Sequence, residues 1–94
     1  DKESRDFDTY ANRISNFIID DQKTLIFTDM FGGTPSNISL TFFKKDYVEI
    51  ISGVNLPMLI KASTLEKYES FEEAVKIISN SGKDNIIVAG DLNI

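Results

Sequence analysis

The stretch Leu25–Asn37, with the sequence LIFTDMFGGTPSN, decides the fold of this chain. Its first residues, Leu25–Phe27, are apolar without alternation, which is typical of a strand buried on both faces in a parallel sheet. Two glycines follow, and then Thr34 and Pro35 predict a helix start, with Thr34 as the N-cap and proline in the first helical position. The stretch therefore predicts a strand, a loop and a helix in direct succession.

Apolar periodicity in the rest of the chain extends this pattern into an α/β fold. In the first expected helix, apolar residues recur at three- and four-residue spacing and predict one buried face, formed by Phe7, Tyr10, Ala11, Ile14, Phe17 and Ile18. The full set of expected elements is helices over residues 7–18, 35–44, 56–62 and 71–81, and strands over residues 24–29, 47–52 and 85–89. The order α-β-α-β-α-α-β predicts a mostly parallel open sheet with helices on both faces and right-handed crossovers. We expect the last strand to lie at the edge of this sheet.

Polar residues at the element boundaries give the expected caps. Asp6 can cap the first helix, and Asn55 can cap the third, where Pro57 is tolerated in the first turn. Ser70 with Glu73 forms a capping box before the last helix. Gly82 is then the expected C-cap of that helix.

Length and composition bound the possible functions. We expect residues 1–94 to form a single domain, because domains typically hold about 100–150 residues. The net charge of −5 argues against binding to nucleic acid or to anionic membranes, and no apolar stretch is long enough to insert into a bilayer. The absence of cysteine excludes disulfides and fits a cytoplasmic protein, and the absence of histidine removes the usual general base.

Acidic side chains gather in the first turn of the last expected helix and in the segment before it, but they do not predict a metal site. They have no histidine beside them and are expected on solvated helix faces. These residues are Glu66, Glu69, Glu72 and Glu73. We expect neither a metal nor another cofactor in this chain.

Polar groups also gather where the strand over residues 24–29 passes into the next helix, at the carboxyl edge where open parallel sheets bind ligands. The helix start offers N–H groups and a partial positive charge to a phosphate, and Gly32 and Gly33 let the backbone approach it. Thr34 adds a hydroxyl, and Asp29 could orient a basic partner such as an imidazole. A tight turn before a capped helix explains the same residues, and both interpretations stay open.

Related phosphate motifs are absent from this segment. The sequence has no G-x-x-x-x-G-K-[ST] and no G-x-G-x-x-G, so a nucleotide-binding loop is excluded. Asp29 at a strand end could suggest a phosphorylated aspartate of the receiver type. Such a site also needs acidic residues from an earlier strand, and no earlier strand is expected here.

Two motifs in the chain resemble one family. Leu25–Asn37 looks like the signature of the EIIA domain of the mannose (mannose/fructose/sorbose) family of the bacterial sugar phosphotransferase system. A second match follows at the right distance in ISGVNLPML, residues 51–59. The resemblance covers nearly the whole chain, from the helix near Phe7 to the strand near Val88.

The resemblance implies a cytoplasmic phosphocarrier in which a histidine accepts a phosphoryl group from phospho-HPr and passes it to EIIB. Asp29 matches the aspartate that hydrogen-bonds this histidine, and Thr34 matches a hydroxyl residue that helps hold the phosphoryl group. The N–H groups around Gly32, Gly33 and Thr34 would stabilise the charge on the transferring oxygens. Residues expected at the site wall or the partner surface are Met30, Phe31, Ser36, Asn37 and Asn55. Asn55 is included because it follows a strand at the same carboxyl edge, and a capped turn explains it equally well.

The chain departs from the family at its start. The family domain begins with a strand, a loop that carries the phosphorylated histidine, a helix and a second strand, and this sequence matches none of them. We therefore expect a fragment of an EIIA domain, incomplete at its N-terminus. The complete domain is expected to be a phosphotransferase component, and the 94-residue chain alone is expected to be inactive.

The resemblance also implies partners and alternatives. The expected partners are HPr, EIIB and a second copy of the chain in a homodimer. One alternative is a regulatory domain of a transcription activator, which would act as a non-catalytic binding module. A further alternative is an EIIA-like subunit that feeds a dihydroxyacetone kinase. The sequence does not indicate which sugar is transported.

Overall fold

A computed structural model describes residues 2–93, with side chains from Asp6 onward. The chain divides into two compact units, one up to Val54 and one from Asn55 on. The first unit contains both strands and two helices, and the second contains two helices and a short 3-10 turn. A two-stranded parallel sheet with four helices confirms the predicted α/β class.

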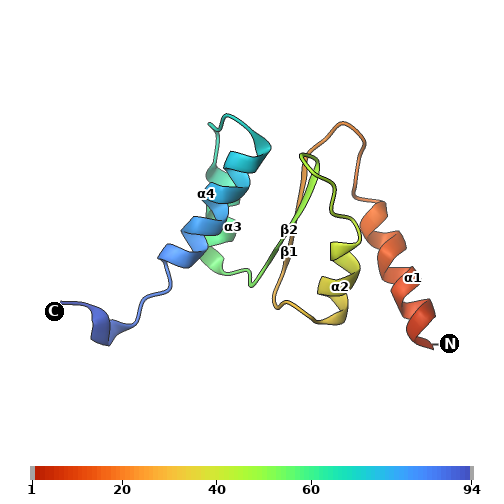
Figure 1. The fold of residues 1–94 in the computed structure, drawn as a ribbon, viewed down its shortest axis with the longest axis horizontal. Coiled ribbons are helices and arrows are strands. Elements are labelled where there is room, and N and C mark those ends of the chain that lie inside the picture. The colour runs from red at the N-terminus through yellow and green to blue at the C-terminus, as the bar shows by residue number, and fades with distance from the viewer. Residues whose placement is uncertain (1, 94) are drawn as a thin grey trace. The chain divides into compact units, whose positions relative to one another are not determined.

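The sheet is formed by β1 (Thr24–Thr28) and β2 (Val48–Ser52). The strands run parallel and in register, so that Thr24 pairs with Val48 and Thr28 pairs with Ser52. Figure 1 shows the two strands side by side, with their carboxyl ends at the same edge. The connection between them contains a helix, as a parallel pair requires.

Helix α2 (Thr34–Leu40) packs against both strands, and α1 (Lys2–Ser15) packs against α2. Figure 1 shows this order of strands, α2 and α1 in the first unit. Ile38 of α2 is completely buried, and Val48 and Ile51 of β2 are buried as well. This small apolar core holds α2 against the sheet.

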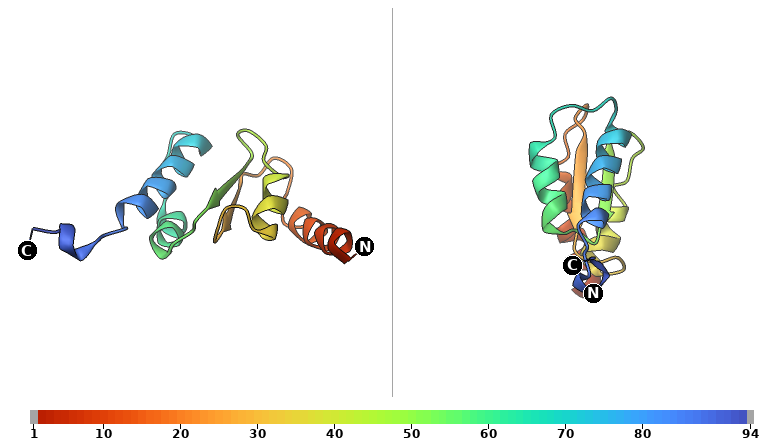
Figure 2. Two further views of the ribbon diagram at one scale, coloured as in Figure 1. Left: turned by 60° about the horizontal axis from the view of Figure 1, so that its bottom comes forward. Right: turned by 90° about the vertical axis from the view of Figure 1, so that its left-hand side faces the viewer.

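The second unit is a pair of helices, α3 (Leu56–Thr64) and α4 (Phe71–Asp84), which lie side by side in Figure 2. Three apolar side chains of this pair are buried: Met58, Ala74 and Ile78. Two predicted caps are confirmed. The Asn55 side chain accepts a hydrogen bond from the Met58 N–H, and Ser70 accepts one from the Glu73 N–H.

The strand expected over residues 85–89 is wrong. Residues 86–88 have no regular structure, and a 3-10 turn, η1 (Ala89–Asp91), follows them. Ile86, Ile87 and Val88 are exposed. A strand needs partners for its N–H and C=O groups, and among residues 2–93 only β1 and β2 pair in a sheet.

Two helix boundaries also differ from expectation. Helix α1 begins at Lys2 and ends at Ser15, so Asp6 lies inside it and does not cap it. Phe17, expected on its buried face, is strongly exposed, because the chain turns out of the helix after Ser15. No glycine or proline interrupts the residues before Asp6, so nothing stops the helix there.

Helix α2 ends at Leu40 and not near residue 44. Thr41 donates its N–H to the Ile38 carbonyl, a tightened bond that closes the helix. Lys44 then exchanges two backbone hydrogen bonds with Val48, which turns the chain into β2. The backbone pairing of Lys44 with Val48 therefore ends the helix earlier than the local sequence pattern predicts.

Two more expectations for the elements need correction. Residues 24–27 of β1 are only partly buried, since the described sheet has two strands and does not enclose them. Gly82 lies inside α4 and is not its C-cap. Within the described part of the chain, no helix is long and apolar enough to cross a membrane.

Candidate functional site

The loop after β1 leads directly into α2, as the sequence predicts. Gly33, with φ −77° and ψ 163°, occupies the N-cap position, and Thr34 is the first helical residue. Thr34 is therefore not the N-cap that the sequence suggests. The Gly33 carbonyl accepts the first helical hydrogen bond, from the Asn37 N–H at 2.8 Å. The N-cap residue, a glycine, makes no side-chain hydrogen bond to this helix, so no cap side chain binds the first N–H groups of α2.

Gly32 gives this loop its shape. Its φ is +92°, in the left-handed region that side chains other than glycine rarely adopt. A methyl group at this position would meet nothing within 4 Å, so backbone conformation and not space requires glycine. Gly33 has ordinary extended backbone and no such requirement.

The candidate side chains fall into two groups by exposure. Asp29, Thr34 and Asn37 are exposed, as are Met30 and Phe31, the latter at 73%. Ser36 is the exception, at 1%, and its hydroxyl lies 3.3 Å from the hydroxyl of Ser52. Most of the loop is therefore open to a partner, whereas Ser36 faces the ends of the strands.

The carboxyl end of β1 is fixed just before Asp29. The Thr28 carbonyl accepts hydrogen bonds from the N–H groups of Gly53 and Val54, at 2.9 and 3.0 Å. Gly53 itself has φ +84° and lets β2 turn sharply toward this carbonyl. These bonds fix the backbone immediately before Asp29.

Thr34 and Asn37 line a pocket together with residues of α1. The pocket has a volume of about 520 Å³, and Asp6, Phe7 and Tyr10 form its other side. Sequence periodicity indicated these α1 residues as a cap and a core face and missed their place beside the loop. Their helical spacing and aromatic content were the available signal, but only the packing of α1 on α2 reveals the pocket.

Asn55 belongs to the second unit and is engaged there. Its side-chain oxygen accepts the Met58 N–H, and its amide donates to the Gly82 carbonyl at 3.0 Å. These bonds join the start of α3 to α4 and support the interpretation of a capped turn. A role for Asn55 in the site stays a prediction.

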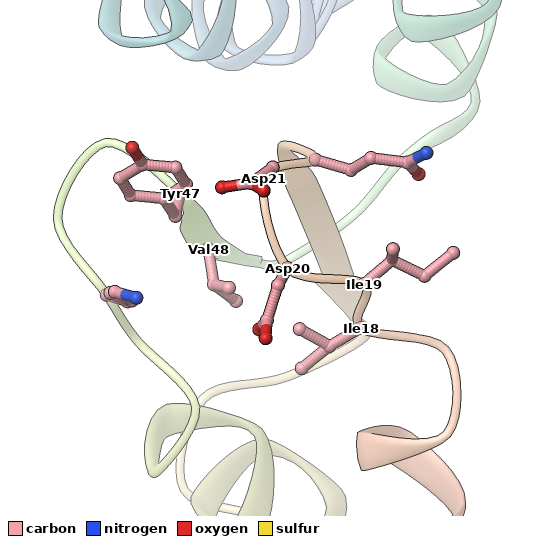
Figure 3. Close-up of a pocket in the computed structure, with 8 residues that line it drawn as sticks. Ile18, Ile19, Asp20, Asp21, Tyr47 and Val48 are labelled. Atoms are coloured by element: carbon pink, nitrogen blue, oxygen red, sulfur yellow. The ribbon is translucent and has the colours of Figure 1, made fainter.

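A second pocket lies at the opposite edge of the sheet, where the strands begin. It has a volume of about 380 Å³, and its polar groups come from Asp20, Asp21, Gln22, Lys44 and Tyr47. Figure 3 shows the Asp20 carboxylate near Val48 and the Asp21 carboxylate on the side of the Tyr47 ring. Ligands of open parallel sheets bind at the carboxyl ends of the strands, so this amino-end pocket is the weaker candidate.

The fold and the motif after β1 place the chain among the EIIA components of the bacterial phosphotransferase system. A sequence profile described as "EIIA-man: PTS system fructose IIA component" matches residues 2–79. Since this match covers most of the chain, the chain belongs to the EIIA-man family. The resemblance found in the two sequence motifs is thereby confirmed.

Individual relatives agree with the profile. The PTS system fructose-specific EIIA component of Bacillus subtilis (strain 168) is 25% identical over 75 residues, which are 79% of this chain and 51% of that protein. The PTS system mannose-specific EIIAB component of Escherichia coli (strain K12) is 32% identical over 71 residues, which are 72% of this chain and 22% of that protein. The chain thus spans about half of the first relative and about a fifth of the second.

A solved structure shares the fold. The crystal structure of phosphotransferase system component EIIA from Streptococcus agalactiae superposes with a TM-score of 0.79 and 24% identity. The match covers 92% of this chain and 69% of that chain. The arrangement of β1, α2 and β2 described above is therefore found in a known EIIA structure.

Proposed function

We propose that this chain supplies the part of an EIIA phosphocarrier domain that follows the phosphorylated histidine. The observation that carries the proposal is the segment from Asp29 to Thr34, which brings a carboxylate, a left-handed glycine and an uncapped helix start together at the carboxyl edge of a parallel sheet. Membership of the EIIA-man family supports a role in sugar uptake.

Each residue of the segment has a proposed task. Asp29 accepts a hydrogen bond from the imidazole of the histidine, which fixes the tautomer and leaves the other ring nitrogen free to attack phosphorus. The N–H groups around Gly32, Gly33 and Thr34 stabilise the negative charge on the phosphoryl oxygens. Thr34 adds its exposed hydroxyl. Met30, Phe31 and Asn37 then border the approach of a partner, since all three are exposed.

The transfer itself exchanges one nitrogen–phosphorus bond for another. The phosphohistidine of HPr loses its phosphoryl group, and the imidazole beside Asp29 gains it. A second exchange passes the group to EIIB. The protein contributes by positioning the reacting groups and by stabilising negative charge, which are the main sources of catalysis in phosphoryl transfer.

The proposed partners are HPr, EIIB and a second copy of the chain, all acting in the cytoplasm. HPr and EIIB follow from the family role. Self-association is supported by the exposed apolar run Ile86–Val88, which has no strand to pair with inside the described unit. The regulatory alternative is not favoured, because the relatives described above are components of phosphotransferase systems.

Phosphate labelling tests the proposal. The complete domain, incubated with phospho-HPr, should acquire an acid-labile, base-stable phosphoryl group. The 94-residue chain should acquire none, because it contains no histidine. An acid-labile adduct on this chain would contradict the proposed division of roles. A complete domain that stays unlabelled would contradict the function itself.

A further inference from the structure

Three hydroxyl groups meet directly beneath the loop that carries Asp29. The Thr28 hydroxyl donates a hydrogen bond to the Ser52 hydroxyl at 2.8 Å. The Ser52 and Ser36 hydroxyls lie 3.3 Å apart and form a second hydrogen bond. We call these three residues the hydroxyl cluster.

The hydroxyl cluster is placed where it can hold the loop from three sides. Thr28 is the last residue of β1, and Ser52 is the last residue of β2 and its partner in the sheet. Ser36 lies in the first turn of α2. The cluster therefore joins the strand before the loop, the helix after it and the neighbouring strand.

Burial makes these bonds directional restraints. Ser36 is 1% exposed and Thr28 is 8% exposed, so water has little access to compete for their hydroxyls. A buried hydroxyl costs free energy unless it is paired, and apolar side chains of the same size would avoid that cost. A paired cluster restricts the strand ends and α2 to the one arrangement in which its bonds are made.

The backbone adds to the same restraint. The Thr28 carbonyl accepts two N–H groups from the turn after β2, so both the side chain and the carbonyl of Thr28 are bound to the β2 end. Asp29 is the next residue. Its position relative to α2 thus depends on the bonds that Thr28 makes.

We propose that Thr28, Ser52 and Ser36 are positioning residues that hold Asp29 and the start of α2 at the separation phosphoryl transfer requires. This inference rests on the proposed function of the loop. None of the three needs to touch the phosphoryl group. Small displacements of catalytic groups cost large factors in rate, so loss of the cluster should slow transfer while leaving partner binding intact.

Variants that change the hydroxyl but not the shape give the sharpest test. Thr28→Val removes the donor and keeps the branched side chain. Ser52→Val and Ser52→Thr have the same shape, and only the threonine retains the hydroxyl. Ser39→Ala is the matched control, because Ser39 is a buried serine of the same helix whose hydroxyl bonds only within α2, to the Pro35 carbonyl at 2.8 Å.

The measurement is the single-turnover rate of phosphoryl transfer from phospho-HPr to the complete domain over a range of phospho-HPr concentrations, with melting temperatures recorded for every variant. Thr28→Val and Ser52→Val should lower the maximal transfer rate about threefold to tenfold, with the half-saturating concentration of phospho-HPr unchanged. Ser52→Thr should restore most of the rate, and Ser39→Ala should keep it. Valine is well suited to a strand position, so the Ser52→Val variant is expected to fold. It therefore tests the cluster even if Thr28→Val folds poorly.

Asp29→Asn, measured in the same assay, separates the proposed function of the loop from the proposed positioning role of the hydroxyl cluster. If Asp29→Asn slows transfer but Thr28→Val and Ser52→Val do not, the positioning role is wrong and the function of the loop stands. Equal losses in Ser52→Thr and Ser52→Val, or in Ser39→Ala, would also overturn the positioning role. If Asp29→Asn leaves transfer unchanged, the proposed function fails and the inference fails with it.

Discussion

At the scale of single residues, backbone conformation separates the two glycines of the loop. Gly32 needs a left-handed φ, whereas Gly33 has extended backbone that any residue can adopt. The sequence shows two adjacent glycines and does not show which of them the turn requires. The N-cap of α2 is likewise not decided by the sequence pattern. The pattern suggests Thr34, because threonine is a common cap, whereas the structure has Gly33 at that position.

Gly32→Ala should therefore lower the free energy of unfolding by about 1–2 kcal/mol, the cost of placing an L-residue in left-handed backbone. Gly90→Ala is the matched control, because a methyl group there also meets open space and its φ is not left-handed. Urea denaturation of the two variants measures the difference. Equal stability of both variants would show that the loop does not hold the described conformation.

At the scale of elements, the sequence predicts what local interactions decide. Asn55 and Ser70 cap their helices as expected, because a cap is made within a few residues. The parallel pairing of β1 and β2 also follows from the apolar runs and the helix between them. The end of α2 depends on the pairing of Lys44 with Val48, and residues 85–89 do not form a strand because they pair with neither strand in the described part of the chain. Local sequence patterns encode neither feature.

Gly82 shows that the sequence alone does not predict how two helices pack against each other. Its place near the end of a helical pattern suggested a C-cap, but it lies inside α4 and faces Met58 of α3. A methyl group on Gly82 would come within 2.6 Å of the Met58 Cγ and 3.0 Å of the Asn55 side-chain oxygen. The absence of a side chain therefore lets α3 and α4 pack closely.

Gly82→Ala should destabilise the protein by about 1 kcal/mol or more, because overpacking outweighs the better helix propensity of alanine. Asn80→Ala, at an exposed position of the same helix, should be neutral or slightly stabilising. Thermal unfolding followed by circular dichroism compares the two. A more stable Gly82→Ala variant would mean that α3 and α4 do not approach each other as described.

At the scale of the whole molecule, apolar side chains exceed what the described core covers. Among the residues whose side chains are described, six apolar ones are buried: Ile38, Val48, Ile51, Met58, Ala74 and Ile78. Other apolar side chains, such as Phe17, Phe31 and Ile86, are mainly exposed. Exposed apolar groups on this scale indicate surfaces that pack against further polypeptide, either the rest of the domain or another chain.

The run Ile86–Val88 gives the prediction at this scale. We expect a homodimer at micromolar concentration, with Ile87→Lys shifting the protein toward the monomer, since a charge on this run opposes apolar pairing. Analytical ultracentrifugation of both proteins measures the effect. The exposed Phe31→Lys serves as a comparison outside the run. A stable monomer of the unmodified protein would remove the proposed dimer.

The central claim is that Asp29 serves phosphoryl transfer and not folding, and its amide variant tests this directly. Asp29 is exposed and follows the strand end, so Asp29→Asn should leave the melting temperature of the complete domain nearly unchanged. The rate of transfer from phospho-HPr should fall at least about tenfold, because an amide oxygen orients and stabilises an imidazole less well than a carboxylate. Asp20→Asn, an exposed aspartate before β1, should transfer at the unmodified rate. Unchanged transfer in Asp29→Asn, with a fall in melting temperature alone, would contradict the account.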